Sequence, residues 1–534
     1  MTRVWIAAIV LVGVMANAAA AQDAKTVVSN ASKAMGVDGL NSIHYYGVAA
    51  NGQLGQNNNA NQPWPLSAAN DYVRAIDFMQ AASRATWQNY AVPVTGGAAA
   101  LAAGQQNIAA DAPWAQKVDI FLTPWGFLKA AATNDLTMRT QTLDGKRYYA
   151  VSVTGSAKSP GGQPYRVVGY INRDTNLVDR VQTWLDHEFF GDMLIEADYL
   201  HYRDAANGLK FPARIVQRRA GWPTFEMYVL GANANPANLQ ALMTPPARGG
   251  GPGGAPPAGG GRGAGAPGDG RGAPAGAAGG RGDGRGGPGG APAAGAQAGA
   301  PPAGRGAAPA APTSEKLAEG VFRINGAYNA LAVEMADHIV LFEPGPQNLT
   351  RARAIITETK RIFPNKPIRY GVISHHHLDH TQGLAEVVAE GITIVTPAVN
   401  RAYLTSAMSA PRTLAPDTLA KSGKKPVVEG FTGDKRVFQD STRTFEIHVI
   451  KGLPHADGLV VGWLPKEKLL VYADMFNLPT EASGPVPNPP VVGTQVFAAN
   501  MERLNLDAER IMSVHNLNPD RLTSRAELLK SLGR

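Results

Sequence analysis

Cysteine is absent from the 534-residue sequence. A chain without cysteine forms no disulfide, carries no lipid on a cysteine and uses no thiol as a nucleophile or metal ligand. Charged residues make up only 17% of the sequence, and the formal net charge is +8. No stripe of Lys and Arg interleaves with aromatic residues, so we expect no nucleic-acid partner.

Apolar runs of transmembrane length are also lacking, so we expect no stable membrane insertion. The sequence begins with a positive charge at Arg3, an apolar stretch from Val4 to Ala16, and the small residues Ala19-Ala20-Ala21. This pattern predicts a secretory signal peptide over residues 1–21. We therefore expect a periplasmic or secreted protein.

Large apolar side chains are missing between Pro245 and Pro312, where Gly, Ala, Pro and Arg account for almost every residue. Such a segment cannot bury enough apolar area to offset the entropy of the chain. We predict a disordered linker over residues 245–312, which joins an N-terminal domain at 22–244 to a C-terminal domain at 313–534. Its Arg-Gly units contain no aromatic residue for base stacking, so we interpret the segment as a tether.

The N-terminal domain is predicted to be mainly antiparallel β. Asp23 to Met35 should form a helix, and the polar tract Asn51–Gln62 a loop, while short alternating runs from Tyr72 to Leu230 predict a sheet with one wet face. The stretch Tyr199–Asp204 with Gly208–Pro212 resembles strands of periplasmic lipoprotein-carrier-like half-barrels, which implies an apolar cavity. A sheet that packs only on itself or on the other domain is the alternative.

Potential metal ligands are concentrated in Ser374-His375-His376-His377-Leu378-Asp379-His380-Thr381-Gln382-Gly383, after the apolar run Ile368–Ile373. Histidines this close would repel one another when protonated, and a metal ion removes that repulsion. A short turn after a strand can direct His375 and His377 at one ion, and Asp379 and His380 at a second. A surface tract with adventitious metal affinity is the alternative, but this tract is internal and precedes a helical stretch.

This motif resembles the signature of the metallo-β-lactamase superfamily, over about Glu319 to the C-terminus. The resemblance implies an α/β fold, namely an αββα sandwich with its metal ions at one edge. The alternation of strands and helices agrees: Tyr328–Met335 and His338–Phe342 should be paired strands, and Gln347–Phe363 an amphipathic helix.

The resemblance also implies the remaining ligands. His455 would complete a three-histidine site with His375 and His377, His515 would join Asp379 and His380, and Asp474 would bridge the two ions. The family often has Gly-His-Gly around the last histidine, where this chain has Val514-His515-Asn516.

Four other residues near or like these ligands are given supporting or structural roles. Glu343 stands where many members of the family have Asp and should orient a ligand or loop. His376 is expected to face solvent or support a ligand, and His448 and His338 are expected to be structural.

The implied function is hydrolysis by two Zn²⁺ ions and a metal-bound hydroxide that Asp379 orients. We expect a small-molecule substrate with an ester, lactone or amide bond. A β-lactam is included, although no Lys or Arg immediately follows Asp474 to bind its carboxylate. The segments 400–430 and 477–493 are predicted to be loops that set the substrate specificity, and the second, which is rich in proline, is expected to rim the pocket. The oligomeric state stays open.

Two other functions remain: a mononuclear iron oxygenase on the same fold, and a periplasmic carrier of apolar ligands with an accessory metal domain. Asp186-His187-Glu188 is a further polar cluster. It is interpreted as a solvated group rather than a ligand set.

Overall fold

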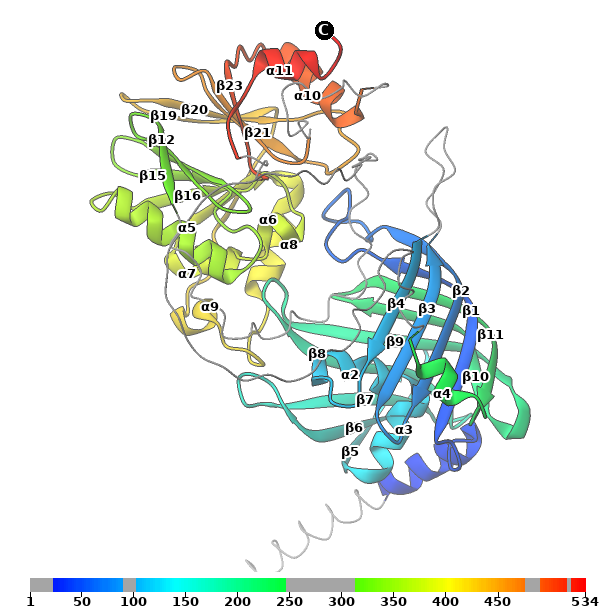
Figure 1. Ribbon diagram of the computed structural model, residues 1–534. Helices are drawn as coiled ribbons and strands as arrows, with labels where there is room; N and C mark the ends of the chain where they lie inside the picture. The colour runs from blue at the N-terminus through cyan, green and yellow to red at the C-terminus, as the bar shows by residue number, and fades with distance from the viewer. Residues whose placement is uncertain (1–22, 90–101, 246–312, 476–489, 516–519) are drawn as a thin grey trace, which may run out of the picture.

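The computed structural model describes residues 23–89, 102–245, 313–475, 490–515 and 520–534. The predicted signal peptide, most of the predicted linker and most of the predicted rim segment 477–493 lie outside these residues. Figure 1 shows an N-terminal β domain and a C-terminal α/β domain side by side. The predicted fold class is confirmed. Among the described residues, no helix is both long and apolar enough to cross a membrane.

The N-terminal domain is a single antiparallel sheet of 11 strands, in the order β4-β3-β2-β1-β11-β10-β9-β8-β7-β6-β5. Side chains on its strands alternate between buried and half-exposed, as in β9, which confirms the predicted wet face. The strands are β1 (Ser42–Gly52), β2 (Leu66–Asp77), β3 (Ala82–Asn89), β4 (Ala102–Ile108), β5 (Asp135–Leu143), β6 (Lys146–Lys158), β7 (Pro164–Asn172), β8 (Val178–His187), β9 (Gly191–Asp204), β10 (Lys210–Arg219) and β11 (Trp222–Ala234).

Helices pack on one face of this sheet. They are the expected helix at residues 23–35, α2 (Trp114–Phe121) and α3 (Pro124–Thr133). The short α4 (Leu239–Met243) lies at the end of the domain, where the carbonyl of Leu242 accepts a hydrogen bond from Arg84 of β3. Thr123 caps the N-terminus of α3, because its side chain accepts a hydrogen bond from the Gly126 amide. Phe127 of α3 is fully buried and packs directly on Gly169 of β7, where a Cβ would lie 2.2 Å from its ring. Phe127 therefore fills this part of the sheet face. The lipoprotein-carrier resemblance stays a prediction.

The C-terminal domain contains two sheets packed face to face. The first has seven strands, β12 (Ser314–Ala318), β13 (Val321–Ile324), β14 (Ala330–Glu334), β15 (Ile339–Phe342), β16 (Ile368–Val372), β17 (Thr393–Pro397) and β18 (Val428–Phe431). The second has six, β19 (Lys435–Gln439), β20 (Thr444–Val449), β21 (Val460–Leu464), β22 (Leu469–Tyr472), β23 (Arg510–Ser513) and β24 (Thr523–Ser524). Phe342 and Val372 from the first sheet and Phe445 and Met512 from the second lie in the core between them.

Helices cover both outer faces of this sandwich, and together with the sheets they form the expected αββα layers (Figure 1). Those of the first sheet are α5 (Leu349–Ile362), α7 (Leu384–Glu390), α8 (Ala398–Ser409) and α9 (Thr418–Ser422). Those of the second are α10 (Val492–Arg503) and α11 (Arg525–Lys530), and the one-turn α6 (Leu378–Thr381) follows β16. The prediction of a loop over 400–430 is wrong, since α8 and α9 occupy much of that segment. α8 buries Leu404 and Met408, which gives it a packed face.

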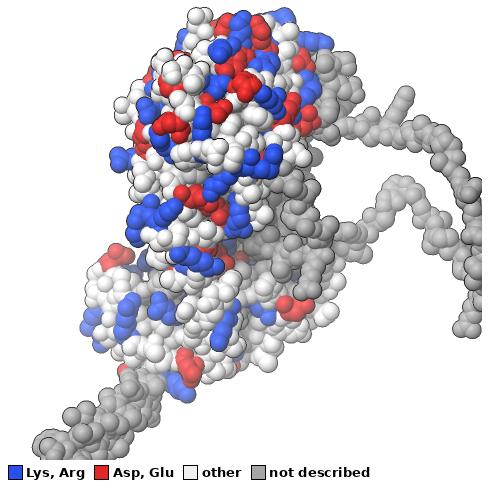
Figure 2. Space-filling model, turned by 90° about the vertical axis from the view of Figure 1, so that its left-hand side faces the viewer, with Lys and Arg blue, Asp and Glu red and all other residues white. Residues whose placement is uncertain are grey.

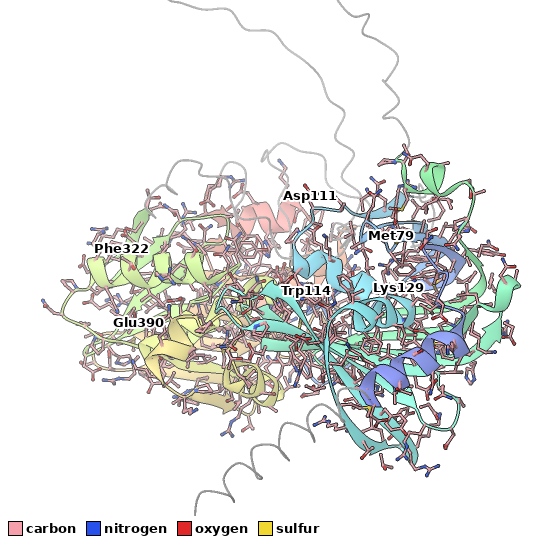
Figure 3. The ribbon with its side chains drawn as sticks, turned by 90° about the horizontal axis from the view of Figure 1, so that it is seen from below. Met79, Asp111, Trp114, Lys129, Phe322 and Glu390 are labelled. Carbon is pink, nitrogen blue, oxygen red and sulfur yellow. The ribbon has the colours of Figure 1, made fainter. Side chains whose placement is uncertain are left out.

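Seen from below, Phe322 and Glu390 mark the C-terminal domain, while Trp114 and Lys129 mark the helices of the N-terminal domain (Figure 3). Aromatic contacts join the domains: the ring of Tyr403 in α8 lies 5.4 Å from that of Phe189, in the turn after β8. On the face shown in Figure 2, basic and acidic side chains are interspersed, and neither sign forms a large patch.

Candidate metal centre

The topology of the two sheets brings the potential ligands to one edge of the sandwich. β16 is parallel to β15, and β23 is parallel to β22, so the carboxyl ends of each pair meet at the same edge. His375 follows β16, Asp474 follows β22 and His515 follows β23, while His455 lies in the connection between β20 and β21. Residues distant in sequence thereby become neighbours.

The first donor group consists of His375, His377 and His455, whose potential ligand atoms all lie within 4.8 Å of one another. The Nε2 atoms of His375 and His455 are 3.2 Å apart. Burial, with the neighbouring imidazoles, holds the pKa of His375 well below its usual value, and burial lowers the pKa of His377 to about 3. These imidazoles are neutral near pH 7, the form that binds a metal.

The second donor group consists of Asp379, His380, Asp474 and His515. Asp474 connects the two groups: its Oδ2 lies 2.7 Å from Nε2 of His380 and 3.6 Å from Nε2 of His375, and its Oδ1 lies 2.8 Å from Nε2 of His515. The backbone of Asp474 has φ 55°. A non-glycine residue in this conformation is uncommon and is frequently found at functional sites.

In the second group, the charges of the carboxylates and the imidazoles oppose the effect of burial on their pKa values. Burial opposes protonation of His380, but the carboxylates of Glu343, Asp474 and Asp379 outweigh it and raise the pKa of His380 well above its usual value. Burial favours the neutral acid of Asp474, yet His380 and His515 lower its pKa well below the usual range. In the absence of a metal, a proton on His380 therefore carries the positive charge that this site attracts.

The donor atoms of the second group are better suited to a metal ion than to a proton shared between them. Nε2 of His380, Nε2 of His515 and Oδ2 of Asp474 are buried without a well-formed hydrogen bond, even though the first and last lie only 2.7 Å apart. Buried polar atoms without partners are uncommon in folded proteins. Imidazole nitrogens and carboxylate oxygens that converge without directional hydrogen bonds are a suitable ligand set for Zn²⁺.

Groups around the donors hold them in place. Glu343, fully buried, accepts a hydrogen bond from the amide of Ser374 at 2.6 Å, and its Oε2 lies 2.8 Å from Nδ1 of His380. The hydroxyl of Tyr328 donates to Oδ2 of Asp379 at 3.0 Å. The supporting role predicted for Glu343 agrees with these contacts. Tyr328 was missed, because an isolated tyrosine just before a strand carries no sequence signal.

His376 is fully buried and does not belong to either donor group. Its Nε2 donates to the backbone carbonyl of Asn57 at 2.8 Å, so the solvent-facing alternative for this side chain is wrong. His448 lies in β20 with its Nε2 2.7 Å from Glu446, and His338 contacts Asp337 at 2.6 Å. Both histidines lie outside the donor groups, as predicted.

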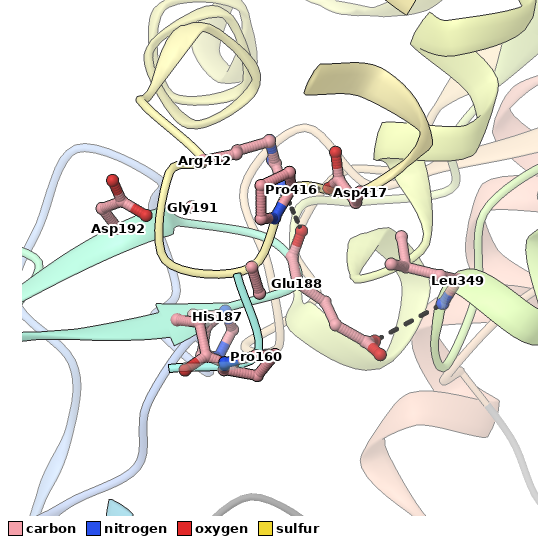
Figure 4. Close-up of a pocket in the computed structure, with 11 residues that line it drawn as sticks. Pro160, His187, Glu188, Gly191, Asp192, Leu349, Arg412, Pro416 and Asp417 are labelled. Atoms are coloured by element: carbon pink, nitrogen blue, oxygen red, sulfur yellow. Dashed lines mark hydrogen bonds and ion pairs between the residues drawn. The ribbon is translucent and has the colours of Figure 1, made fainter. Parts of the chain in front are cut away.

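Asp186-His187-Glu188 lies at the contact between the domains. A pocket there is lined by residues from the turn between β8 and β9 and from the segment between α8 and α9 (Figure 4), and it includes none of the seven potential ligands. Glu188 accepts hydrogen bonds from Gln382 at 3.2 Å and from the amide of Leu349 at 3.4 Å. The side chain of Glu188 therefore joins the two domains and is not simply solvated, whereas Asp186 and His187 bond within the N-terminal domain. As expected, none of the three residues belongs to a donor group.

Comparison with known proteins found matches over the C-terminal domain. The Metallo-beta-lactamase superfamily model matches residues 324–515. Among solved structures, the chain is similar to a metallo-beta-lactamase from Pontibacter korlensis, with 17% identity and a TM-score of 0.32, over 42% of this chain and 97% of that one. It is also similar to FIM-1 from Pseudomonas aeruginosa in the mono-zinc form, with 16% identity and a TM-score of 0.30, over 42% and 93% of the two chains. No curated protein matches the sequence.

Proposed function

We propose that this protein, whose C-terminal domain is similar to the metallo-β-lactamase superfamily, is an exported zinc-dependent hydrolase of esters, lactones or amides. The observation that carries the proposal is the pair of donor groups joined by Asp474, in which three buried donor atoms make no well-formed hydrogen bond. The predicted signal peptide supports export.

Two zinc ions, when bound, would activate a water molecule near neutral pH and polarise the carbonyl of the substrate. The chain supplies the groups around that chemistry. Burial favours the neutral form of Asp379, but His380 and the side-chain amide of Gln56 outweigh it, and the pKa of Asp379 is lowered. Asp379 is therefore a carboxylate at pH 7 and can accept a proton from the attacking water. Tyr328 holds Oδ2 of this carboxylate in position.

The substrate reaches the site from the side of Asp379, His455 and His515, whose side chains are each about a third exposed. His375 and His380, by contrast, are fully buried. The residue after Asp474 is Met475, a buried apolar side chain that offers no charge to a substrate carboxylate. This favours neutral esters, lactones and amides over β-lactam antibiotics, which carry a carboxylate.

A complete second donor group favours a two-metal site over the mononuclear iron alternative. The deciding experiment is elemental analysis of protein purified without chelator or nickel resin, followed by assays on ester, lactone, amide and β-lactam panels. We expect about two zinc ions per chain. His377→Ala and Asp379→Ala should abolish turnover while the fold survives, and His338→Gln, outside the donor groups, should retain metal and activity. A variant at His377 that keeps the wild-type rate after losing its metal would overturn the proposal.

A further inference from the structure

The connection between β1 and β2, residues 53–65, leaves the N-terminal sheet and lies against the metal centre; it is called the β1–β2 loop below. Its backbone pairs with the C-terminal domain on both sides of the first donor group. The carbonyl of Gly55 accepts from the amide of Leu378 at 3.3 Å, and the carbonyl of Asn58 accepts from the amide of Asp457 at 2.6 Å. Leu378 follows His377 directly, and Asp457 lies two residues after His455. The loop therefore spans two ligand-bearing segments.

Asn57 contacts a potential ligand through its backbone. Its carbonyl oxygen lies 3.0 Å from Nε2 of His377 and 2.8 Å from Nε2 of His376. A carbonyl only accepts hydrogen bonds, so Nε2 of His377 carries the proton and Nδ1 keeps the lone pair. The contact thus selects the tautomer in which Nδ1 of His377 is the metal-binding atom.

Gln56 contacts a ligand of the second group. Its side-chain Nε2 donates to Oδ1 of Asp379 at 3.0 Å, although the two residues are 323 positions apart. The other oxygen, Oδ2, accepts from Tyr328 and lies 3.4 Å from Nε2 of His380. One donor on each oxygen restricts rotation of the carboxylate and leaves Oδ2 on the side of the second donor group.

The β1–β2 loop is built to hold this position. Asn57 is fully buried, and its side-chain Nδ2 donates to the carbonyls of Asn59 and Gln62 within the loop. Gly55 has φ +72°, and a Cβ on it would lie 2.2 Å from Cγ of Leu378. Both the backbone conformation and the close approach require glycine there. The close approach to Leu378 is a contact with the metal motif of the other domain, which a loop that only connected two strands would not make.

We propose that the β1–β2 loop is an integral part of the metal centre, in which Asn57 and Gln56 are positioning residues for His377 and Asp379. The N-terminal domain thereby sets the affinity for both metal ions: Asn57 acts on the first donor group and Gln56 on the second. This proposal rests on the proposed function, because it requires that the two donor groups bind metal.

The test is a Zn²⁺ titration of the full-length protein against a chromophoric chelator, with the absorption spectrum of the Co²⁺-loaded protein as a second readout. Groups that hydrogen-bond to metal ligands typically contribute about 10–100-fold to metal affinity. We therefore expect Gln56→Ala to lower the affinity for one of the two zinc ions by about that factor. Gly55→Ala, which displaces the loop, should lower the affinity for both ions. Gln56→Ala should leave the melting temperature of the metal-free protein nearly unchanged and alter the Co²⁺ spectrum.

Asn61→Ala is the matched control. Asn61 belongs to the same loop and donates to the carbonyl of Val399 in the C-terminal domain, but it contacts no ligand. We expect this variant to keep wild-type affinity for both ions. Wild-type affinities in both Gln56→Ala and Gly55→Ala would overturn the role of the loop and leave the hydrolase proposal intact. A wild-type protein that binds no divalent metal would overturn both.

Discussion

Glu343 and His380 form a fully buried carboxylate–imidazole pair, with Oε2 of Glu343 2.8 Å from Nδ1 of His380. Glu343 comes directly after β15 and has φ 61°, a conformation uncommon outside glycine. Its other oxygen accepts from the amide of Ser374. One carboxylate therefore fixes both the start of the histidine motif and the ring of its last histidine.

Glu343→Gln should lower the affinity of the second donor group for Zn²⁺ by about 10–100-fold. The introduced amide would donate to Nδ1 of His380, so the ring proton would move to Nε2 and remove the lone pair needed by the metal. Glu343→Ala should also destabilise the fold, by about 3–5 kcal/mol, because it leaves a buried imidazole without its partner. Zn²⁺ titration and thermal unfolding separate the two effects. Equal zinc affinity in wild type and Glu343→Gln would show that this pair does not orient a ligand.

Removal of metal should lower the melting temperature. Zinc bound only to the folded protein stabilises it by about 2.7 kcal/mol when the free ion is at 100 times its dissociation constant. Thermal scans after chelator treatment, and again after Zn²⁺ is restored, measure this difference. Mg²⁺ is the control, because it prefers oxygen ligands and should not replace zinc among histidines. Scans that coincide with and without chelator would contradict the metal centre.

Arg412 should be required for the contact between the domains. Its side chain is 4% exposed and donates to the carbonyl of Glu188 in the N-terminal domain (Figure 4). It also donates to the carbonyl of Phe189 and to Asp417. Arg412→Ala should destabilise the protein by about 3–5 kcal/mol, because it leaves the buried charge of Asp417 unpaired. Thermal unfolding and limited proteolysis near residue 188 measure the loss. Arg401→Ala, on the exposed side of α8, should change stability by no more than about 0.5 kcal/mol.

His187 should make this contact sensitive to acid. Its Nδ1 accepts hydrogen bonds from the amides of Phe189 and Phe190, which requires an unprotonated nitrogen. Burial, with the charges of Arg219 and Arg412, lowers the pKa of His187 from 6.5 to about 4. As the pH falls, the unfolded chain takes up the proton first. The stability contributed by His187 is therefore complete above pH 6.5 and is lost as the pH falls towards 4.

Melting temperatures across this pH range test the effect. In His187→Asn the side-chain oxygen can still accept from the amide two residues on, but it does not titrate. The variant should therefore lose less stability than wild type between pH 6.5 and 4. If the melting temperatures of the two proteins fall in parallel with pH, His187 is not the source of the acid sensitivity.

The metal motif could be predicted because its information is local. Four potential ligands lie within His375–His380, directly after a strand, and a turn of that length keeps them together in any packing of the rest. The alternation of apolar and polar residues likewise indicated the N-terminal sheet, since side chains on a strand point to opposite faces. His455, Asp474 and His515 were expected through the family resemblance. Parallel strand ends bring Asp474 and His515 to the edge where the connection between β20 and β21 places His455.

The tertiary structure alone decided how the two domains share the site. The acceptor for His377 is a backbone carbonyl of Asn57, which every residue possesses, so no side chain in the sequence marks it. Gln56 lies in a polar tract that reads as an ordinary loop, and its contact with Asp379 depends on how one domain packs against another. Segment 400–430 was mistaken for a loop for a related reason. The buried face of α8 depends on its packing against the first sheet of the C-terminal domain and against the turn after β8 in the N-terminal domain. Local pattern determined most of the strands and the four ligands of the histidine motif, whereas packing over hundreds of residues determined what surrounds them.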